Sequence, residues 1–246
     1  MKAYRLDDLK RKIKDFPSIE LICRPTPLYP LANLNQPTEA AKILIKRDDL
    51  TGLAFGGNKS RKLEFILADA LKKGADTIIT WGALQSNWCL QLAAAARKVG
   101  LRPVLLLFKS YDVPAFYEGN VFLEYLLDAQ IKIKESEERG KSVNQDKALA
   151  LLEELAARER AEGHRPYLVP VGGSTCGGHL DKPLGALSYF QAMLEIYEQT
   201  VSRPAPPDYI VIASGSGGTQ AGLIVGAKAL GLKTRVVGIC VSDKKE

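Results

Sequence analysis

Two spacings of hydrophobic residues alternate along the chain. Short runs rich in β-branched residues predict strands at Ile43–Ile45, Thr77–Thr80, Val104–Phe108, Ile131–Ile133, Tyr167–Val169, Tyr209–Ile212 and Arg235–Val241. Between them, apolar residues recur with helical spacing and predict helices at Ser60–Lys73, Asn87–Val99, Gly119–Leu127, Asn144–Glu162, Pro183–Glu198 and Thr219–Leu230. Gly74, Gly100 and Gly231 each follow such a segment, as is common at helix C-termini. The alternation predicts an α/β fold in which a parallel sheet is covered on both faces.

The composition indicates a globular protein rather than a membrane or secreted one. The 246 residues are 46% hydrophobic and 25% charged, and no window approaches about 18 consecutive apolar residues. The first residues lack the apolar core of a secretory signal. The four cysteines, Cys23, Cys89, Cys176 and Cys240, form no C-x-x-C pair and match no disulfide framework, so we expect a reducing, cytoplasmic location.

The charge distribution argues against a nucleic-acid-binding protein, and the spacing of His and Cys argues against a metal site. Lys and Arg give a formal net charge of +6 but are scattered among acidic residues without a long basic block. This distribution argues against nucleic-acid binding and suits an anionic small ligand. Cys176 and His179 lie in one glycine-rich segment, yet a single His and a single Cys make neither a metal site nor a catalytic dyad, so we expect no metal.

A glycine-rich turn before a predicted helix holds the first candidate for chemistry. Gly56 and Gly57 allow positive φ angles and a close approach of the backbone to a ligand. Lys59 then opens the helix, where the positive end of the helix dipole disfavours the ammonium form. A lowered pKa favours the neutral amine, the form that attacks an aldehyde. The alternative interpretation is a surface lysine that happens to follow a turn.

Two more loops follow predicted strands, at the edge of a parallel sheet where ligands bind. In the first, Ser86 can cap the next helix, or the free amides there can hold a carboxylate, while Asn87 can donate to a phenolate oxygen. The second loop, residues 214–219, exposes backbone N–H groups at a helix N-terminus and forms a candidate phosphate cradle. It is neither a P-loop nor a dinucleotide fingerprint, and a flexible serine-glycine turn is the alternative.

Together these segments resemble the aminocyclopropane-carboxylate deaminase and D-cysteine desulfhydrase family of fold type II enzymes, which use pyridoxal 5'-phosphate (PLP). Four motifs carry the resemblance in the family's order: KRDDLTG…GGNKSRKLE, QSN, VPVGGS…PLGALSY and SGSGGTQAG. The match runs from about Leu21 to the C-terminus. It implies a two-domain α/β architecture with parallel sheets, like the tryptophan synthase β-subunit. Residues 1–58 and 172–246 would form a large domain and residues 59–171 a small one, with PLP between them.

The resemblance also implies roles for individual residues. Lys59 would form the Schiff base with PLP and remove the α-proton of the substrate. Lys62 would reach the phosphate, Asn87 the phenolic oxygen, and Ser86 the substrate carboxylate. The remaining phosphate ligands would be the four residues Ser216, Gly217, Gly218 and Thr219.

The chain departs from the family pattern at three places. Trp88 stands where the family usually has His or Gln, on the substrate side. Residues 175–182 form an apparent insertion. The last predicted strand is followed by only Ser242–Glu246, whereas family members usually continue for several tens of residues. We therefore expect an incomplete large domain, without the active-site tyrosine and the partner of the pyridine nitrogen.

The activity that the resemblance implies is a PLP-dependent lyase reaction on a small amino acid. The Ser-Gly-Ser-Gly-Gly-Thr form of the phosphate loop favours D-cysteine desulfhydrase, which yields pyruvate, ammonia and sulfide. 1-Aminocyclopropane-1-carboxylate deaminase is the alternative within the family. An inactive PLP-binding remnant, or one half of a split enzyme completed by a C-terminal chain, stays open, and so does a homodimer. A plain dinucleotide-binding protein is disfavoured by the missing fingerprint.

Overall fold

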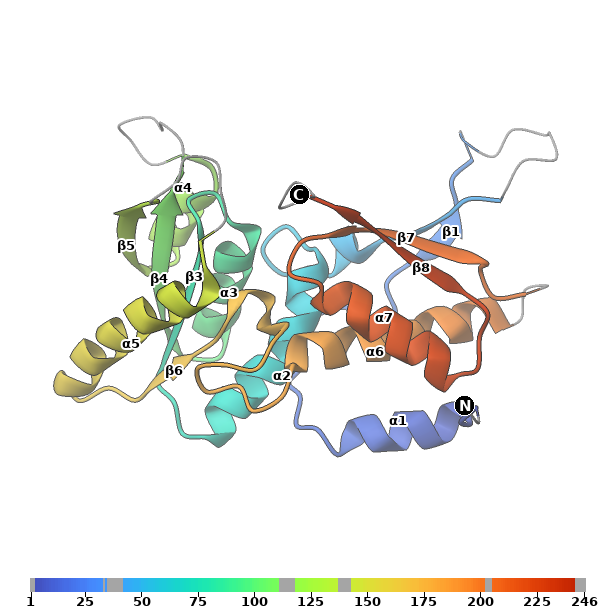
Figure 1. Ribbon diagram of the computed structural model, residues 1–246, viewed down its shortest axis with the longest axis horizontal. Helices are drawn as coiled ribbons and strands as arrows, with labels where there is room; N and C mark the ends of the chain where they lie inside the picture. Colours follow the sequence, from blue (N-terminus) through green and yellow to red (C-terminus); the bar gives the residue numbers. More distant parts are fainter. Residues whose placement is uncertain are drawn as a thin grey trace.

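The computed structural model describes residues 3–32, 34, 42–110, 118–136, 143–201 and 205–241. Figure 1 shows two lobes on either side of a central helix, α2. The helices of this part of the chain are α1 (Leu6–Lys14), α2 (Asn58–Lys72), α3 (Asn87–Lys98), α4 (Gly119–Leu126), α5 (Gln145–Ala161), α6 (Leu184–Val201) and α7 (Gly218–Ala229), with short 3-10 turns η1 (Asp48–Leu50) and η2 (Val171–Gly173). The six helices expected from the sequence are confirmed to within a few residues, and α1 is additional.

The strands of the described residues form three sheets. They are β1 (Leu28–Pro30), β2 (Leu44–Lys46), β3 (Thr77–Ala83), β4 (Arg102–Lys109), β5 (Gln130–Glu135), β6 (Pro166–Leu168), β7 (Tyr209–Ser214) and β8 (Arg235–Cys240). The main sheet is parallel, in the order β5–β4–β3–β6, and β7 pairs with β8 in parallel as well. The parallel sheet is therefore confirmed, while the antiparallel pair β1–β2 was not expected.

Alternating residues of the main sheet enter two separate cores. Ile78 and Leu105 point to one face and pack with α2 and α3 in the largest core. Their neighbours Ile79 and Leu106 point to the other face and pack against α5 through residues such as Leu152. The odd-even division follows from the two-residue period of a strand. Both faces of this sheet are thus covered, as the continuous apolar runs predict.

The second lobe is built on the close packing of α6 and α7. A Cβ on Gly222 would lie 2.2 Å from the carbonyl oxygen of Ala186, so the two backbones approach as near as glycine allows. Ile210 and Ile212 of β7 pack on this helix pair. The lobe brings the loop between β7 and α7 to the centre of the molecule, beside α2 (Figure 1).

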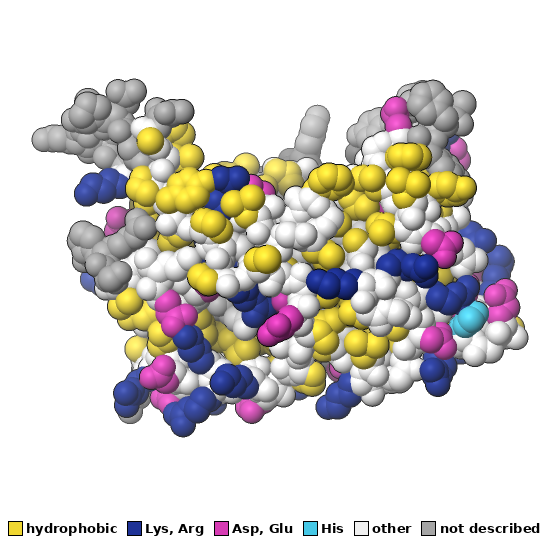
Figure 2. Space-filling model, turned by 180° about the vertical axis from the view of Figure 1, so that it is seen from behind, with side chains coloured by type: hydrophobic (Ala, Val, Ile, Leu, Met, Phe, Trp, Pro, Cys, Tyr) yellow, Lys and Arg dark blue, Asp and Glu magenta, His cyan; other side chains and the backbone are white. Residues whose placement is uncertain are grey.

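The other face of β7 and β8 stays uncovered. Val211 is 65% exposed and Ile239 is 54% exposed, and Tyr209 and Val237 share their face. In Figure 2 hydrophobic side chains gather along the upper edge of the molecule, the side on which β7 and β8 lie. The expectation of two covered faces does not hold for this pair, because nothing in the described part of the chain packs there. This agrees with an incomplete large domain; residues 242–246 lie outside the described residues.

Helix α2 is the element that both lobes share. It packs against α3 on one side and α6 on the other, and buries every residue from Ser60 to Ala68. The predicted division into residues 1–58, 59–171 and 172–246 sets a boundary at its N-terminus and stays a prediction. None of the described helices is long and apolar enough to cross a membrane.

Candidate active site

A tight loop delivers Lys59 to the start of α2. The loop passes through Gly56 and Gly57, with φ angles of +75° and +118°. The Gly57 N–H donates to the Asp48 carbonyl oxygen at 2.7 Å. A Cβ on Gly56 would lie 1.8 Å from the Asp49 carbonyl oxygen, so no other residue fits there. The turn therefore requires the glycines that mark it in the sequence, and it makes Lys59 the second residue of α2.

The Lys59 amine is half-buried and has one hydrogen-bond partner within the described residues. It donates to the Asn58 side-chain oxygen at 3.0 Å, and the Asn58 nitrogen donates to Thr219 Oγ1 at 3.2 Å. Burial lowers the pKa of Lys59. The direction agrees with the expectation from the helix N-terminus, but the cause is desolvation of the ammonium. The neutral amine thus forms at lower pH than in an ordinary lysine.

Lys62 lies one turn further along α2 and is 1% exposed. No hydrogen bond or ion pair reaches its amine from the described residues. Burial, and secondarily the charge of Lys59, lowers the pKa of Lys62 to about 7. A buried ammonium without a partner is costly, and an anion placed beside it would relieve that cost.

The Lys62 amine borders the N-terminus of α7. A Cβ built on Gly218 would lie 3.2 Å from Lys62 Nζ and 2.4 Å from Ser174 Oγ, so glycine is needed to keep this space open. Gly217 precedes the helix in a left-handed conformation and supplies no side-chain cap. The Ser174 and Ser216 hydroxyls lie 2.8 Å apart across the same space. Uncapped amides, two hydroxyls and a buried amine form a cradle suited to a phosphate.

The loop after β3 supplies the opposite side of the site. Ser86 caps α3 by accepting from the Cys89 N–H at 3.3 Å, which leaves its own hydroxyl hydrogen free to donate. Asn87 is exposed at the first position of α3, one turn before Gln91 on the same helix face. Gln91 accepts from Ser60 Oγ on α2 at 2.8 Å. The face of α3 that carries Asn87 and Gln91 therefore turns toward the start of α2, while the roles given to Ser86 and Asn87 stay predictions.

Trp88 belongs to the core behind this loop. It is 1% exposed, and its indole N–H donates to Thr80 Oγ1 at 2.8 Å. The Thr80 hydroxyl in turn donates to the Val169 carbonyl oxygen at 2.8 Å. The residue that departs from the family pattern is therefore a core residue, and it ties β3, α3 and the end of β6 together.

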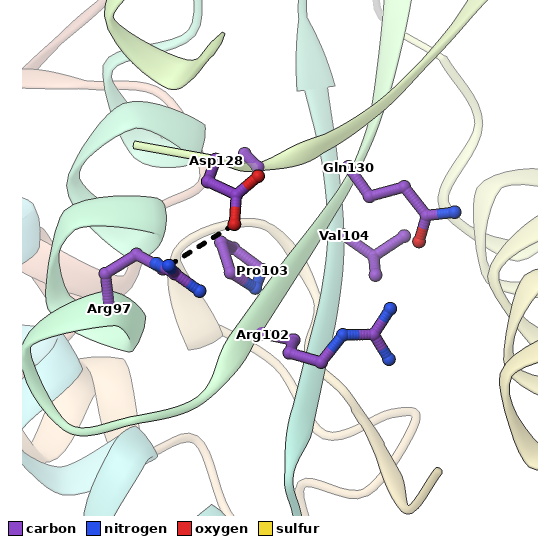
Figure 3. Close-up of a pocket in the computed structure, with 7 residues that line it drawn as sticks. Arg97, Arg102, Pro103, Val104, Asp128 and Gln130 are labelled. Carbon is purple, nitrogen blue, oxygen red and sulfur yellow. Dashed lines mark ion pairs between the residues drawn. The ribbon is translucent and has the colours of Figure 1, made fainter. Parts of the chain in front are cut away.

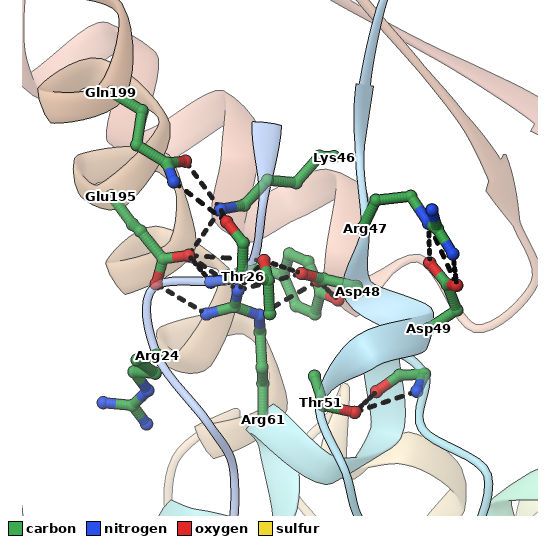
Figure 4. Close-up of polar contacts among 12 residues, drawn as sticks. Arg24, Thr26, Lys46, Arg47, Asp48, Asp49, Thr51, Arg61, Glu195 and Gln199 are labelled. Atoms are coloured by element: carbon green, nitrogen blue, oxygen red, sulfur yellow. Dashed lines mark hydrogen bonds and ion pairs between the residues drawn. The ribbon is translucent and has the colours of Figure 1, made fainter. Parts of the chain in front are cut away.

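A buried ion cluster, which the sequence reasoning missed, fixes the position of α2. Arg61 donates to Asp48 at 2.8 Å and to Glu195 of α6 at 2.9 Å (Figure 4). Lys46 and Tyr189 complete the cluster, since Lys46 donates to Glu195 and the Tyr189 hydroxyl donates to Asp48 at 2.6 Å. These bonds raise the pKa of Arg61 and lower that of Glu195 to about 2. The signal in the sequence was the charged run 46–49 next to a helix that must be buried.

The two histidines lie away from this site. His179 accepts from the Leu168 N–H at 2.9 Å, a structural role. His164 can bring a ligand atom within 4.8 Å of atoms from two glutamates, yet Glu159 already accepts from Arg102.

A cavity of about 460 Å³ opens at the amino edge of the main sheet, lined by Arg97, Arg102, Pro103, Val104, Asp128, Ala129 and Gln130 (Figure 3). Lys59 lies at the opposite, carboxyl edge, so this cavity is separate from the site.

The site fits a ligand that carries both a phosphate and an aldehyde. The cradle offers a buried, unpartnered amine together with helix amides, and the Asn58–Thr219 contact sets the second amine, Lys59, directly beside it. PLP has both groups. The residues present therefore fit this cofactor.

Comparison with known proteins identifies close relatives. The sequence model of the pyridoxal-phosphate dependent enzyme family matches residues 19–245. A D-cysteine desulfhydrase of Serratia proteamaculans is 43% identical over 240 residues, 96% of this chain and 68% of that protein. One of Klebsiella pneumoniae subsp. pneumoniae is 45% identical over 230 residues, 92% of this chain and 65% of that protein. The chain thus spans about two thirds of the length of these relatives.

Solved structures show the same architecture. An ACC deaminase homologue superimposes with a TM-score of 0.82 at 37% identity, covering 100% of this chain and 68% of that one. Escherichia coli diaminopropionate ammonia lyase superimposes with a TM-score of 0.68 at 16% identity, over 97% of this chain and 65% of that one, and supports the fold alone. The two-lobed α/β fold expected from the motifs is therefore confirmed.

Proposed function

The chain belongs to the family of pyridoxal-phosphate-dependent enzymes, and we propose that it acts as a D-cysteine desulfhydrase. D-Cysteine and water would yield pyruvate, ammonia and sulfide. The observation that carries the proposal is the pair of amines on α2 at the carboxyl edge of the sheet, the buried Lys62 amine against a glycine cradle and the half-buried Lys59 amine a turn away. The identity of 43–45% with D-cysteine desulfhydrases supports the choice of substrate.

Each residue has a distinct task in this proposal. When bound, PLP supplies an aldehyde and an electron-withdrawing ring. Lys59, whose lowered pKa favours the neutral amine, would hold the cofactor at its aldehyde group and would accept the proton from the substrate α-carbon. Lys62, Ser216, Gly217, Gly218 and Thr219 hold the phosphate. Ser86 orients the substrate carboxylate with its hydroxyl hydrogen, and Asn87 donates to the phenolic oxygen.

Absorbance and turnover test the proposal on the same sample. Purified protein supplied with PLP should be yellow, and Lys59→Ala should lose the colour. D-Cysteine should then release sulfide and pyruvate in equal amounts. Lys73→Ala is a matched control, because it removes an α2-flanking lysine whose amine pairs with Asp69 and Asp181 at the surface. A wild-type protein that shows no spectral change with PLP would refute the cofactor site.

One structural relative favours a second candidate. The ACC deaminase homologue shares 37% identity and the whole fold of this chain, so aminocyclopropane-carboxylate deaminase is the alternative activity. Its ring opening would yield a 2-oxo acid and ammonia without sulfide. Assaying both substrates on one preparation separates them, because sulfide appears only from D-cysteine.

The relatives are longer than this chain, which gives a third candidate function. Because the chain spans about two thirds of them, it could bind PLP without turnover, or turn over only with a complementing C-terminal chain. Colour without product favours the first, and product that appears with a co-purifying chain favours the second.

We further propose a homodimer and a cytoplasmic location. The exposed apolar face of β7 and β8 supports association, and four cysteines outside any disulfide suit a reducing compartment. Light scattering at two concentrations tests the dimer, and fractionation of cells that produce the chain tests the location.

A further inference from the structure

The side chain of Asn58 bridges the reactive amine and the phosphate cradle. Its oxygen accepts from Lys59 Nζ at 3.0 Å, and its nitrogen donates to Thr219 Oγ1 at 3.2 Å, across 161 positions of sequence. We infer that Asn58 is a positioning residue that couples anion binding in the cradle to the orientation of the Lys59 amine. The inference rests on the proposed PLP site and concerns a residue with no role in it so far.

The chemistry of the three groups fixes the direction of this hydrogen-bond chain. The Asn58 oxygen faces Lys59 Nζ, where it accepts from the ammonium and equally from a hydrogen of the neutral amine. The amide nitrogen then faces Thr219 and uses a lone pair of its hydroxyl. Consequently the Thr219 hydroxyl hydrogen remains free for an acceptor. Thr219 is the second residue of α7, where the uncapped amides begin, so a phosphate oxygen in the cradle is the acceptor within reach.

An anion in the cradle would then strengthen the hydrogen bond that Lys59 donates to Asn58. Donation from Thr219 to a phosphate makes its oxygen a better acceptor for Asn58, and the Asn58 oxygen becomes a better acceptor for the amine. A neutral amine that donates one hydrogen to Asn58 keeps its lone pair directed away from that bond. Phosphate binding thereby holds the nucleophile in one orientation, ready for a carbonyl carbon on the other side.

The coupling can be measured with the two halves of the cofactor supplied separately. Pyridoxal carries the aldehyde without the phosphate, and inorganic phosphate alone can fill the cradle. We expect phosphate to accelerate the reaction of pyridoxal with Lys59, followed by absorbance, by roughly threefold to tenfold, the value of about one net hydrogen bond. Asn58→Ala and Thr219→Val should lose this acceleration, and Thr219→Ser, which keeps the hydroxyl, should retain it.

Asn144→Ala is the matched control. Asn144 also stands at the start of a helix, capping α5 by accepting from the Asp146 N–H at 2.9 Å, and it takes no part in the hydrogen-bond chain from Lys59 to Thr219. The acceleration should survive in this variant. If Asn58→Ala does not fold, the Thr219→Val and Thr219→Ser pair answers the same question. Acceleration that persists in Asn58→Ala or in Thr219→Val, or that is absent from a wild-type protein that binds PLP, overturns the inference. A wild-type protein that does not bind PLP refutes the proposed function instead.

Discussion

Replacing Lys62 by methionine should stabilise the cofactor-free protein and weaken PLP binding at the same time. Methionine keeps an unbranched stem of similar length, so it can fill the space that Lys62 occupies. It removes only the amine, which finds no partner in the described part of the chain, from a residue that is 1% exposed as a whole. The change therefore isolates the free energy of holding the charge of Lys62 in the folded protein without the cofactor.

The magnitude follows from the pKa of Lys62, which burial lowers from 10.5 to about 7. At about 1.4 kcal/mol for each pKa unit, the protonated side chain costs the folded protein about 5 kcal/mol at pH 6. Between pH 7 and 10.5 the unfolded chain holds a proton that the folded chain has released, so the wild-type free energy of unfolding rises with pH across this window. Lys62→Met has no such proton, so the part of this rise that comes from Lys62 should disappear, while the part from Lys59, whose pKa burial also lowers, remains.

Urea unfolding without PLP at pH 6, 8 and 10 measures the effect. Lys62→Met should be more stable than wild type by several kcal/mol at pH 6, and the two proteins should converge toward pH 10. In the same variant the phosphate of PLP loses one charge-assisted hydrogen bond, worth about 1.5–3 kcal/mol, so its dissociation constant should rise by roughly 10- to 100-fold. A variant that is less stable at pH 6, or that keeps the wild-type pH dependence, would show that Lys62 is not a buried, unpaired cation.

Three further predictions concern other buried groups. Glu124→Gln should stabilise the protein at pH 9 and have little effect at pH 5, because burial raises the pKa of Glu124 to about 8 and both its oxygens lack hydrogen bonds within the described residues; urea midpoints at the two pH values test this. Gly218→Ala should weaken PLP binding more than tenfold, since its Cβ would come 2.4 Å from a serine hydroxyl oxygen, whereas Gly215→Ala, with nothing within 4 Å, should bind normally by calorimetry. Glu195→Gln should cost roughly 3 kcal/mol of unfolding free energy, because it leaves the buried guanidinium of Arg61 short of a counter-charge; equal stability of variant and wild type would contradict a structural role.

The sequence predicts the elements well because apolar spacing determines them. The strand at Thr77–Thr80 and the helix at Asn87–Val99 appear within a few residues of their expected bounds, since each buries a face of definite period. The site loops could be placed too, because a loop that follows a parallel strand must lie at its carboxyl edge. In the structure Lys62 borders Gly218, and Asn58 donates to Thr219, so segments far apart in sequence meet here; the roles given to Lys62 and Thr219 stay predictions.

The burial of the charged residues of helix α2 could not be predicted from the sequence of that helix. Arg61, Lys62 and Glu64 are each 1% exposed, although a pattern of charged residues indicates a solvated face. They are buried because α2 lies between two lobes, and that position depends on the packing of α3 and α6 rather than on the sequence of α2. The Arg61 cluster and the bridge made by Asn58 both arise from this central position, so neither could be predicted from local spacing.

The position of α2 between the two lobes also explains why the lysine amines of the site lower the stability of the folded protein. Two amines one turn apart on a buried helix repel each other, and neither has a carboxylate partner in the described residues; each pKa is lowered by burial. A bound anion supplies the missing charge, so cofactor affinity and folded-state stability are linked through Lys62. Replacing this lysine to stabilise the protein must therefore weaken its hold on the phosphate. Stability can instead be gained at Glu124, whose carboxyl group has no part in the proposed chemistry.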